Sequence, residues 1–445
     1  MEYYRFNPGK KTSIVLISIF TIIAIIDSTI VKYITYSGND FSISSNVSTF
    51  VIFSFCFAIT GTIALLSIRR STYKSAFKQT LDIRYFYAIA TTTLITNISI
   101  IVIIIFQMIL VNQYNVLLLS TITYVSHITT LFVLIFLIYI FLRWLKVRRN
   151  LMVMLYAVSF LLICINVVVS TIYLEYIFSR TLTLDRRAFP IHLFVIRQEV
   201  YPMTESLSSI FDILYLLSYF AMWTATGILL FQYRNKVGRI KYALLVTAPL
   251  IYLTFTYLDY FGNLFSTLII NSPVSFNVMY TIVFSATKQV GALLFSVTFF
   301  VASSLVPNMR VRKSLLISSI GMVMLFGSIE IETLQYRLYP PFGLITDSFM
   351  PLGAYLLFIG IFTSADGISR DGDLRREFHK SAMSQLGLIK SIGISEMEAT
   401  LIRKFKSAEK YTSMSEMNDS SSYEEENVKD IIRDVLNEIY SKNKK

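Results

Sequence analysis

The residues best suited to chemistry are one lysine and a few acids inside long apolar stretches. Residues 277–307, NVMYTIVFSATKQVGALLFSVTFFVASSLVP, are apolar apart from a central pair, Lys288 and Gln289. A charge that deep in a span is costly, so it faces protein or water and needs a partner. An ammonium group among carboxylates can balance one of them and leave another to bind a cation, a proton or a polar solute. Lys288 and Gln289 are therefore the first candidate substrate-binding residues.

Three acids complete this candidate site: Asp27, Asp259 and Glu330. At 1.5 Å per helical residue, Lys288 lies roughly 15 Å below the outer boundary of its span, and the acids lie within about 10 Å of theirs. The lysine stem can extend outward, which brings its ammonium to the depth of the carboxylates. The alternative is a structural ion pair, with the remaining acids wetted by lipid headgroups. Asp27 could equally bond the backbone of its own helix.

These residues are positioned by helices long enough to cross a bilayer. Hydrophobic residues make up 54% of the 445 residues and charged residues only 15%. About 20 helical residues span the hydrocarbon core. We expect ten spans, at about residues 13–36, 48–68, 85–110, 116–142, 151–176, 208–233, 242–261, 278–306, 314–335 and 345–365. The predicted fold is an all-α polytopic transmembrane helix bundle, multi-pass in the cell membrane and in contact with its lipid.

The connections between spans alternate in charge. With the N-terminal segment, alternate connections hold 19 basic residues: Arg5, Lys10, Lys11, Arg69, Arg70, Lys74, Lys78, Arg84, Arg143, Lys146, Arg148, Arg149, Arg234, Lys236, Arg239, Lys241, Arg310, Arg312 and Lys313. The opposite connections hold five: Arg180, Arg186, Arg187, Arg197 and Arg337. The positive-inside rule then predicts that both termini are cytoplasmic. Of the outer loops, we expect residues 177–207 to lie on the membrane surface as a short amphipathic helix or hairpin.

The composition changes after residue 365, which predicts a transmembrane domain over 1–365 and a cytoplasmic tail over 366–445. In the tail we expect helices at about 374–392, 396–410 and 427–441, with 411–426 disordered. Ser395 and Glu398 have the spacing of a capping box that opens the second helix. The last helix is amphipathic and too short to be stable alone, so it predicts a cytoplasmic protein partner or self-association through residues 427–441.

Several function classes are disfavoured by the composition. The net charge of +12 belongs to the membrane part, since the tail is nearly neutral, so nucleic acid is not an expected partner. Cys56 and Cys164 both fall in apolar runs, and no metal-ligand spacing or cofactor fingerprint occurs. We therefore predict no metal, no cofactor and no enzyme activity. A membrane-embedded enzyme using an outer Asp/Glu pair as acid and base is the least favoured alternative.

The histidines and hydroxyl residues have plainer interpretations. His127 lies in a stripe of serine and threonine on the predicted span 116–142, where such residues usually join helices. We interpret His127 as a packing residue rather than a proton relay. The segment around His379 loosely resembles the phospho-accepting helix of sensor histidine kinases. Only about 65 residues follow it, without the motifs of an ATP-binding domain, so we interpret His379 as a solvated helix residue.

From Tyr339 onward, the stretch YPPFGLITDSFMPLGAYLLFIGIFTSADGISRDGDLRREFHKS resembles a family of uncharacterised multi-span membrane proteins of ammonia-oxidising-type archaea. The points of likeness are Pro340-Pro341-Phe342-Gly343, the Ser348-Phe349-Met350 opening of the last span and the SADGISRDGDLRR turn into the tail. The resemblance implies the same multi-span topology and an archaeal source. It implies no activity, because that family has none assigned.

Two functions fit these features. The first is a transporter-like protein, with a polar intramembrane site opening to the outside and built from two inverted five-helix halves. The second is a membrane sensor or receptor that couples its outer loops to the cytoplasmic helical tail. The intramembrane charge favours transport.

Overall fold

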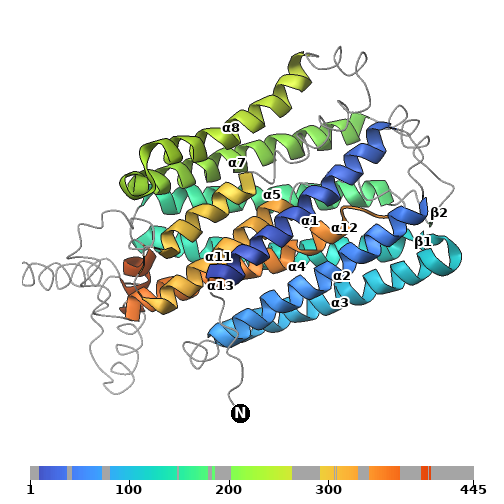
Figure 1. The fold of residues 1–445 in the computed structure, drawn as a ribbon. Coiled ribbons are helices and arrows are strands. Elements are labelled where there is room, and N and C mark those ends of the chain that lie inside the picture. The colour runs from blue at the N-terminus through green and yellow to red at the C-terminus, as the bar shows by residue number, and fades with distance from the viewer. Residues whose placement is uncertain are drawn as a thin grey trace, which may run out of the picture.

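The computed structural model describes residues 10–37, 43–72, 81–147, 150–178, 183–185, 202–262, 291–304, 306, 308–328, 340–370, 392–398 and 400–401 (Figure 1). The helices are α1 (Lys10–Ser37), α2 (Ile43–Thr72), α3 (Leu81–Val111), α4 (Val116–Val147), α5 (Leu151–Phe178), α7 (Pro202–Val237), α8 (Arg239–Gly262), Gly291–Ser304, α11 (Met309–Ser328), α12 (Leu344–Ser348) and α13 (Met350–Arg370). Residues 392–398, the tail helix from here on, are also helical.

Seven helices of the described part are long and apolar enough to cross a membrane: Val47–Leu66, Arg84–Val111, Val116–Val147, Leu151–Glu175, Ser209–Phe231, Val311–Ser328 and Leu344–Gly367. Two shorter apolar helices cover Ser13–Asp27 and Gly291–Ser304. The chain is thus a multi-pass, all-α membrane protein, as the hydropathy pattern predicts. Each of the ten predicted spans overlaps a described helix, but the count of ten and the side on which the termini lie stay predictions.

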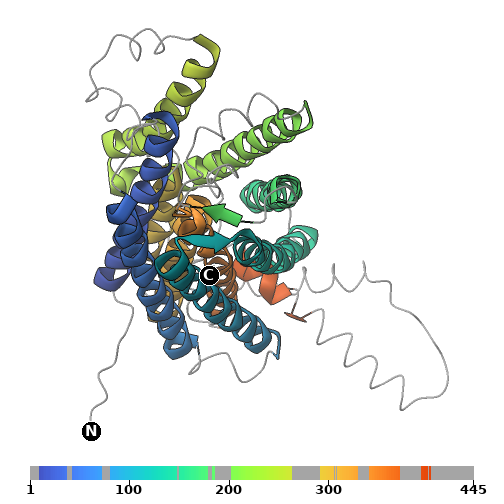
Figure 2. The same ribbon diagram turned by 90° about the vertical axis from the view of Figure 1, so that its right-hand side faces the viewer.

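The helices differ sharply in how much of their surface faces the outside of the bundle. In the most apolar part of Leu344–Gly367, 100% of the residues are buried. The corresponding share is 89% for Val311–Ser328 and 28% for Arg84–Val111. In Figures 1 and 2, α11 and α13 run through the middle of the bundle, between α1 and α2 on one side and α4 and α5 on the other. Exposed side chains on α3 such as Ile103, Phe106 and Ile109 are apolar, which fits contact with lipid.

Small residues allow the two central helices to pack against each other at close range. A Cβ atom added at Gly321 of α11 would lie 2.3 Å from the backbone nitrogen of Leu357. One added at Gly353 of α13 would lie 2.6 Å from the backbone nitrogen of Leu325. Only glycine permits such an approach of two backbones, as is common between membrane helices. α11 and α13 therefore pack backbone against backbone at these two glycines.

A short antiparallel sheet ties two connections together at one end of the bundle. Strand β1 (Gln113–Asn115), between α3 and α4, pairs with β2 (Thr183–Asp185), which follows α5. Residues 183–185 thus pair with the connection between α3 and α4. A short amphipathic helix or a hairpin within residues 177–207 was expected. An alternating polar and apolar pattern of three residues is too short to predict a strand.

Candidate functional site

The candidate site surrounds a break in the last span. The five-residue helix α12 ends at Ser348, Phe349 forms a turn, and α13 begins at Met350. Pro351 accounts for the break, because it has no N–H to donate to the carbonyl of Asp347, four residues earlier, and its ring crowds that carbonyl. The break therefore falls beside Asp347, whose residue surface is 1% exposed.

Gly343 shapes the turn that leads into α12. Its φ of 95° lies in the left-handed region, which costs little for glycine and is disfavoured for other residues. Its carbonyl accepts the first helical hydrogen bond, from the Asp347 N–H at 3.0 Å. Its own N–H donates to Oδ1 of Asp27 on α1, at 2.8 Å.

Asp27 is held entirely by the α12 segment. Its second oxygen, Oδ2, accepts a hydrogen bond from the hydroxyl of Thr346, and the residue is 1% exposed. The backbone N–H of Thr346 also donates to this carboxyl group, so each oxygen has at least one described donor. The alternative that Asp27 bonds the backbone of its own helix does not match these contacts. Both donor residues lie more than 300 residues away in sequence.

A buried histidine and a second buried acid meet on the other side of α12. Nε2 of His127, on α4, lies 3.3 Å from Oδ1 of Asp347. Nδ1 of the same ring lies 2.8 Å from the hydroxyl oxygen of Thr171 on α5. His127 is 1% exposed and lies about 17 Å along α4 from Val116, well inside the thickness of a bilayer. Both ring nitrogens therefore have partners, on two different helices.

Asp347 is only half satisfied. Its second oxygen, Oδ2, is buried and has no hydrogen-bond partner among the described residues. An unpaired buried carboxylate oxygen carries a desolvation cost of several kcal/mol, unless the group is neutralised or binds something. Among the described residues, this oxygen is the clearest unused hydrogen-bond acceptor for a ligand.

Phenylalanines seal the α12 segment on the side of α1 and α2. Phe349 packs edge-on against Phe20 and Phe57, with ring centroids 5.0 and 4.6 Å apart, and Phe342 packs edge-on against Phe50 at 5.9 Å. All five rings are 0% exposed. Electrostatic interactions are stronger in such an apolar setting than in water. A change of charge on Asp347 would therefore carry a large energy.

Hydroxyl and amide side chains join α3 to α4 beside the site. Thr93 and Thr129 lie 3.1 Å apart between hydroxyl oxygens, and Asn97 Nδ2 donates to Ser126 at 3.0 Å. The predicted role of the polar stripes as links between helices is confirmed for this pair. His127 also links helices, because its ring contacts Asp347 of α12 and Thr171 of α5.

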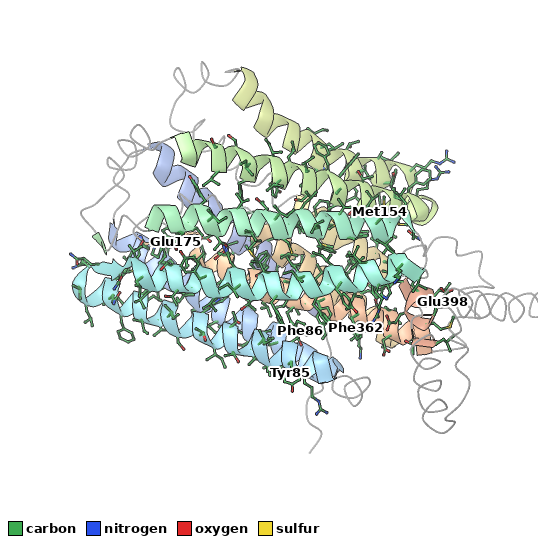
Figure 3. All side chains as sticks on the ribbon, turned by 180° about the vertical axis from the view of Figure 1, so that it is seen from behind. Tyr85, Phe86, Met154, Glu175, Phe362 and Glu398 are labelled. Atoms are coloured by element: carbon green, nitrogen blue, oxygen red, sulfur yellow. The ribbon has the colours of Figure 1, made fainter. Side chains whose placement is uncertain are left out.

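A second polar pair leads from the site toward the end of the bundle that carries β1 and β2. The hydroxyl of Tyr124, one turn before His127 on α4, donates to Glu175, one turn after Thr171 on α5. Glu175 is exposed, and Figure 3 shows it at the end of α5, far from the opposite end where Glu398 lies. The two pairs together run from the exposed end of the helices to the buried acid.

Of the site residues expected from sequence, the structure includes one in this cluster, Asp27. Lys288, Gln289 and Glu330 lie outside the described residues, and for Asp259 only the backbone is described, in the last turn of α8. The contact between Lys288 and the three acids thus stays a prediction.

Asp347, Thr346 and Thr171 were not expected in the site. Asp347 did carry a signal, since it is an acid within the predicted span 345–365. Nothing local indicated that it meets His127, 220 residues earlier in the chain. That contact depends on which helices are neighbours.

At the opposite end of the bundle, the tail helix is fixed to α4 through one carboxylate. Oε2 of Glu396 accepts hydrogen bonds from the Arg143 guanidinium and from the Trp144 indole, the latter at 2.8 Å. Glu396 is 4% exposed, and Ile392 and Met397 beside it are also buried. The chain is helical from at least Ile392, so Ser395 lies within this helix rather than at its N-cap.

No protein-family model, no curated protein and no solved structure matches this chain. The resemblance of the segment after Tyr339 to archaeal membrane proteins therefore stays an expectation. Any functional conclusion depends on the geometry of the buried cluster.

Proposed function

We propose that the protein is a transporter of the cell membrane whose substrate pathway passes the cluster of Asp27, His127, Thr171, Thr346 and Asp347. The observation that carries this proposal is the half-satisfied Asp347 at the break between α12 and α13. Ionisable residues inside a membrane are rare and usually mark ion or solute pathways. Interrupted helices are a common way for transporters to build binding sites.

The distribution of charge supports a site that opens to the outside. The basic residues whose side chains are described, Arg84, Arg143, Lys146, Arg234, Arg239, Lys241, Arg312 and Lys313, lie at helix ends opposite β1 and β2. By the positive-inside rule, that end is cytoplasmic, and so are both termini. The Tyr124–Glu175 pair then lies on the outer side and forms the entrance to the pathway.

Flux measurements with purified protein in lipid vesicles test this function. We expect vesicles to take up at least one member of a panel of inorganic ions, amino acids, sugars and nucleosides, and Asp347→Asn to abolish the uptake. Ser348→Ala is the matched control, because Ser348 is the next residue, similarly buried, and within the described residues its hydroxyl bonds the Leu344 carbonyl of its own helix alone. No uptake across the panel, or equal uptake by the two variants, would count against transport.

A sensor that couples an outside event to the tail is the second candidate. It is favoured by the contact of Glu396 with α4, because that helix also carries His127. Hydrogen exchange of residues 392–398 in vesicles distinguishes it: a sensor should change the exchange of this segment when only the outer buffer is acidified. Constant exchange would leave the tail helix with a structural role.

A further inference from the structure

We propose that the ligand of the buried site is a proton, shared by His127 and Asp347, and that its loss separates α12 from α4. This inference rests on the proposed function, in that it names the species the site binds during transport. The hydrogen bonds around the imidazole ring and the small number of ligating atoms in the site support it.

Thr171 determines which ring nitrogen of His127 carries a hydrogen. Its hydroxyl lies 2.7 Å from the carbonyl of Val167, one turn earlier on α5, and donates its single hydrogen there. Toward His127 Nδ1, at 2.8 Å, the same oxygen can then only accept. The hydrogen-bond network therefore assigns a hydrogen to Nδ1.

A neutral imidazole with its hydrogen on Nδ1 presents a lone pair at Nε2. That lone pair faces Asp347 Oδ1 at 3.3 Å, and two lone pairs at this distance repel each other. One further proton must lie between the two atoms, either on Nε2 or on Oδ1. In both cases the pair carries no net charge, which is the least costly condition for groups that are 1% exposed. The proton belongs to the pair rather than to either residue.

The alternative arrangement is less favourable on two counts. If Thr171 donated to Nδ1, then Nε2 would carry the only ring hydrogen, and an ionised Asp347 would have no counter-charge among the described residues. The Val167 carbonyl would lose its hydroxyl donor. Oδ2, which has no described partner, would then carry uncompensated charge in an apolar setting.

The small number of ligating atoms in the site suits a proton better than a metal ion. Zinc takes four ligands and calcium six or more, whereas a proton needs one lone pair. Within the described residues, no group of three or more His, Cys, Asp or Glu side chains could hold a metal. The facing pair of His127 Nε2 and Asp347 Oδ1 accommodates a proton without further ligands.

The other titratable groups around the pair are few in the described part of the chain. Asp27 on α1 reaches Thr346, the neighbour of Asp347, and Tyr124 and Glu175 lie one turn toward the end that carries the sheet. The remaining described titratable groups in the spans packed around α12 and α4 are Cys56, Tyr87, Tyr139, Tyr156, Cys164, Tyr173 and Tyr355, and, near the helix ends opposite β1 and β2, Arg84, Tyr85, Arg143, Lys146, Arg312, Lys313 and Asp366. The exposed Glu175 and the Tyr124 hydroxyl offer a route by which a proton enters.

Loss of the shared proton turns an attractive contact into a repulsive one. The carboxylate then faces the imidazole lone pair, and both are buried. α12 can respond because Pro351 interrupts its continuity with α13, whereas α4 and α5 are continuous helices across the site. We infer that deprotonation moves Asp347 away from His127 and exposes the carboxylate to the substrate pathway.

Histidine-selective NMR tests this on the full-length protein in lipid, because the chain has only three histidines. In a His192→Gln, His379→Gln background the remaining ¹⁵N signals belong to His127. We expect Nδ1 to be protonated at every pH, and the dipolar coupling between ¹⁵Nε2 of His127 and ¹³Cγ of Asp347 to be strong in acid and lost in alkali. With Asp347→Asn the coupled transition should disappear, while Ser348→Ala should retain it.

Two results would overturn the proposal: an unprotonated Nδ1, or a coupling to Asp347 that stays constant over the whole pH range. The first would mean that a neutral His127 donates from Nε2 to Asp347, and the second would mean that pH does not separate α12 from α4. This readout needs no substrate, so it separates the two proposals. A normal NMR transition with no flux in vesicles would reject transport and keep the proton site, whereas flux with a constant coupling would reject the proton site alone.

Discussion

The carboxyl group of Asp27 accepts the backbone N–H of Gly343 at 2.8 Å, which joins the first described helix to the segment that opens the last span. The glycine supplies the φ of 95° and the acid supplies the acceptor. With the Thr346 hydroxyl on the second oxygen, this contact anchors one side of α12, while His127 meets the other side.

Replacing Asp27 by alanine should lower the free energy of unfolding by about 3 kcal/mol, because a buried N–H and a buried hydroxyl both lose their acceptor. Denaturant unfolding in detergent micelles, followed by the fluorescence of the buried Trp144, measures this change. Thr21→Ala is the matched control on the same helix. The Thr21 hydroxyl bonds only the Ile17 carbonyl, so its loss should change stability by less than about 0.5 kcal/mol. Equal effects of the two substitutions would contradict the anchoring role of Asp27.

Thr171→Val should destabilise the protein by about 1–3 kcal/mol, because it removes the acceptor of the His127 Nδ1–H and leaves that donor buried. Thr171→Ser keeps the hydroxyl and should restore most of the loss. The same NMR signals should show that the valine variant shifts the ring hydrogen toward Nε2. If valine and serine behave alike, Thr171 does not orient the ring.

Gly321→Ala should cost about 1–3 kcal/mol, because the added Cβ atom would meet the Leu357 backbone, which cannot move without displacing α13. Gly227→Ala on α7 is the control, since a Cβ atom there meets nothing within 4 Å. Alanine is the better helix former, so this control should be neutral or stabilising by up to about 1 kcal/mol. Thermal unfolding of the two variants in the same detergent compares them directly.

Glu396→Ala should release the tail helix, because Arg143 and Trp144 would lose their shared acceptor. A charge-assisted hydrogen bond contributes about 1.5–3 kcal/mol, which corresponds to a fall of about tenfold to a hundredfold in amide protection of residues 392–398. Glu396→Gln keeps an acceptor for the indole and should have an intermediate effect. Leu401→Ala, at an exposed position of the same segment, should leave the protection unchanged.

Hydropathy predicted the helices well, because the length of an apolar run is a local property. The run at 85–110 is part of α3 (Leu81–Val111), and the run at 116–142 is part of α4 (Val116–Val147). The division of the last span was missed, since Phe349 and Met350 are themselves apolar and continue the run. Pro351 was the only local signal.

The site itself was only partly predictable. Asp27 was identified because a charge in an apolar run is conspicuous in any sequence. Its partners were not, because a backbone N–H leaves no mark in composition. The meeting of His127 with Asp347 depends on α12 packing against α4, and no periodicity within either segment encodes that neighbour.

The pairing of β1 with β2 bears on which part of the site is free to rearrange. This pairing joins the segment before α4 to the segment after α5. The two helices that carry His127 and Thr171 are therefore connected at this end by the sheet. The opposing part, α12, is held to α1 through Asp27, has no strand pairing among the described residues and adjoins a helix break. Any rearrangement at the buried cluster should therefore leave the imidazole stationary and carry the acid toward or away from it.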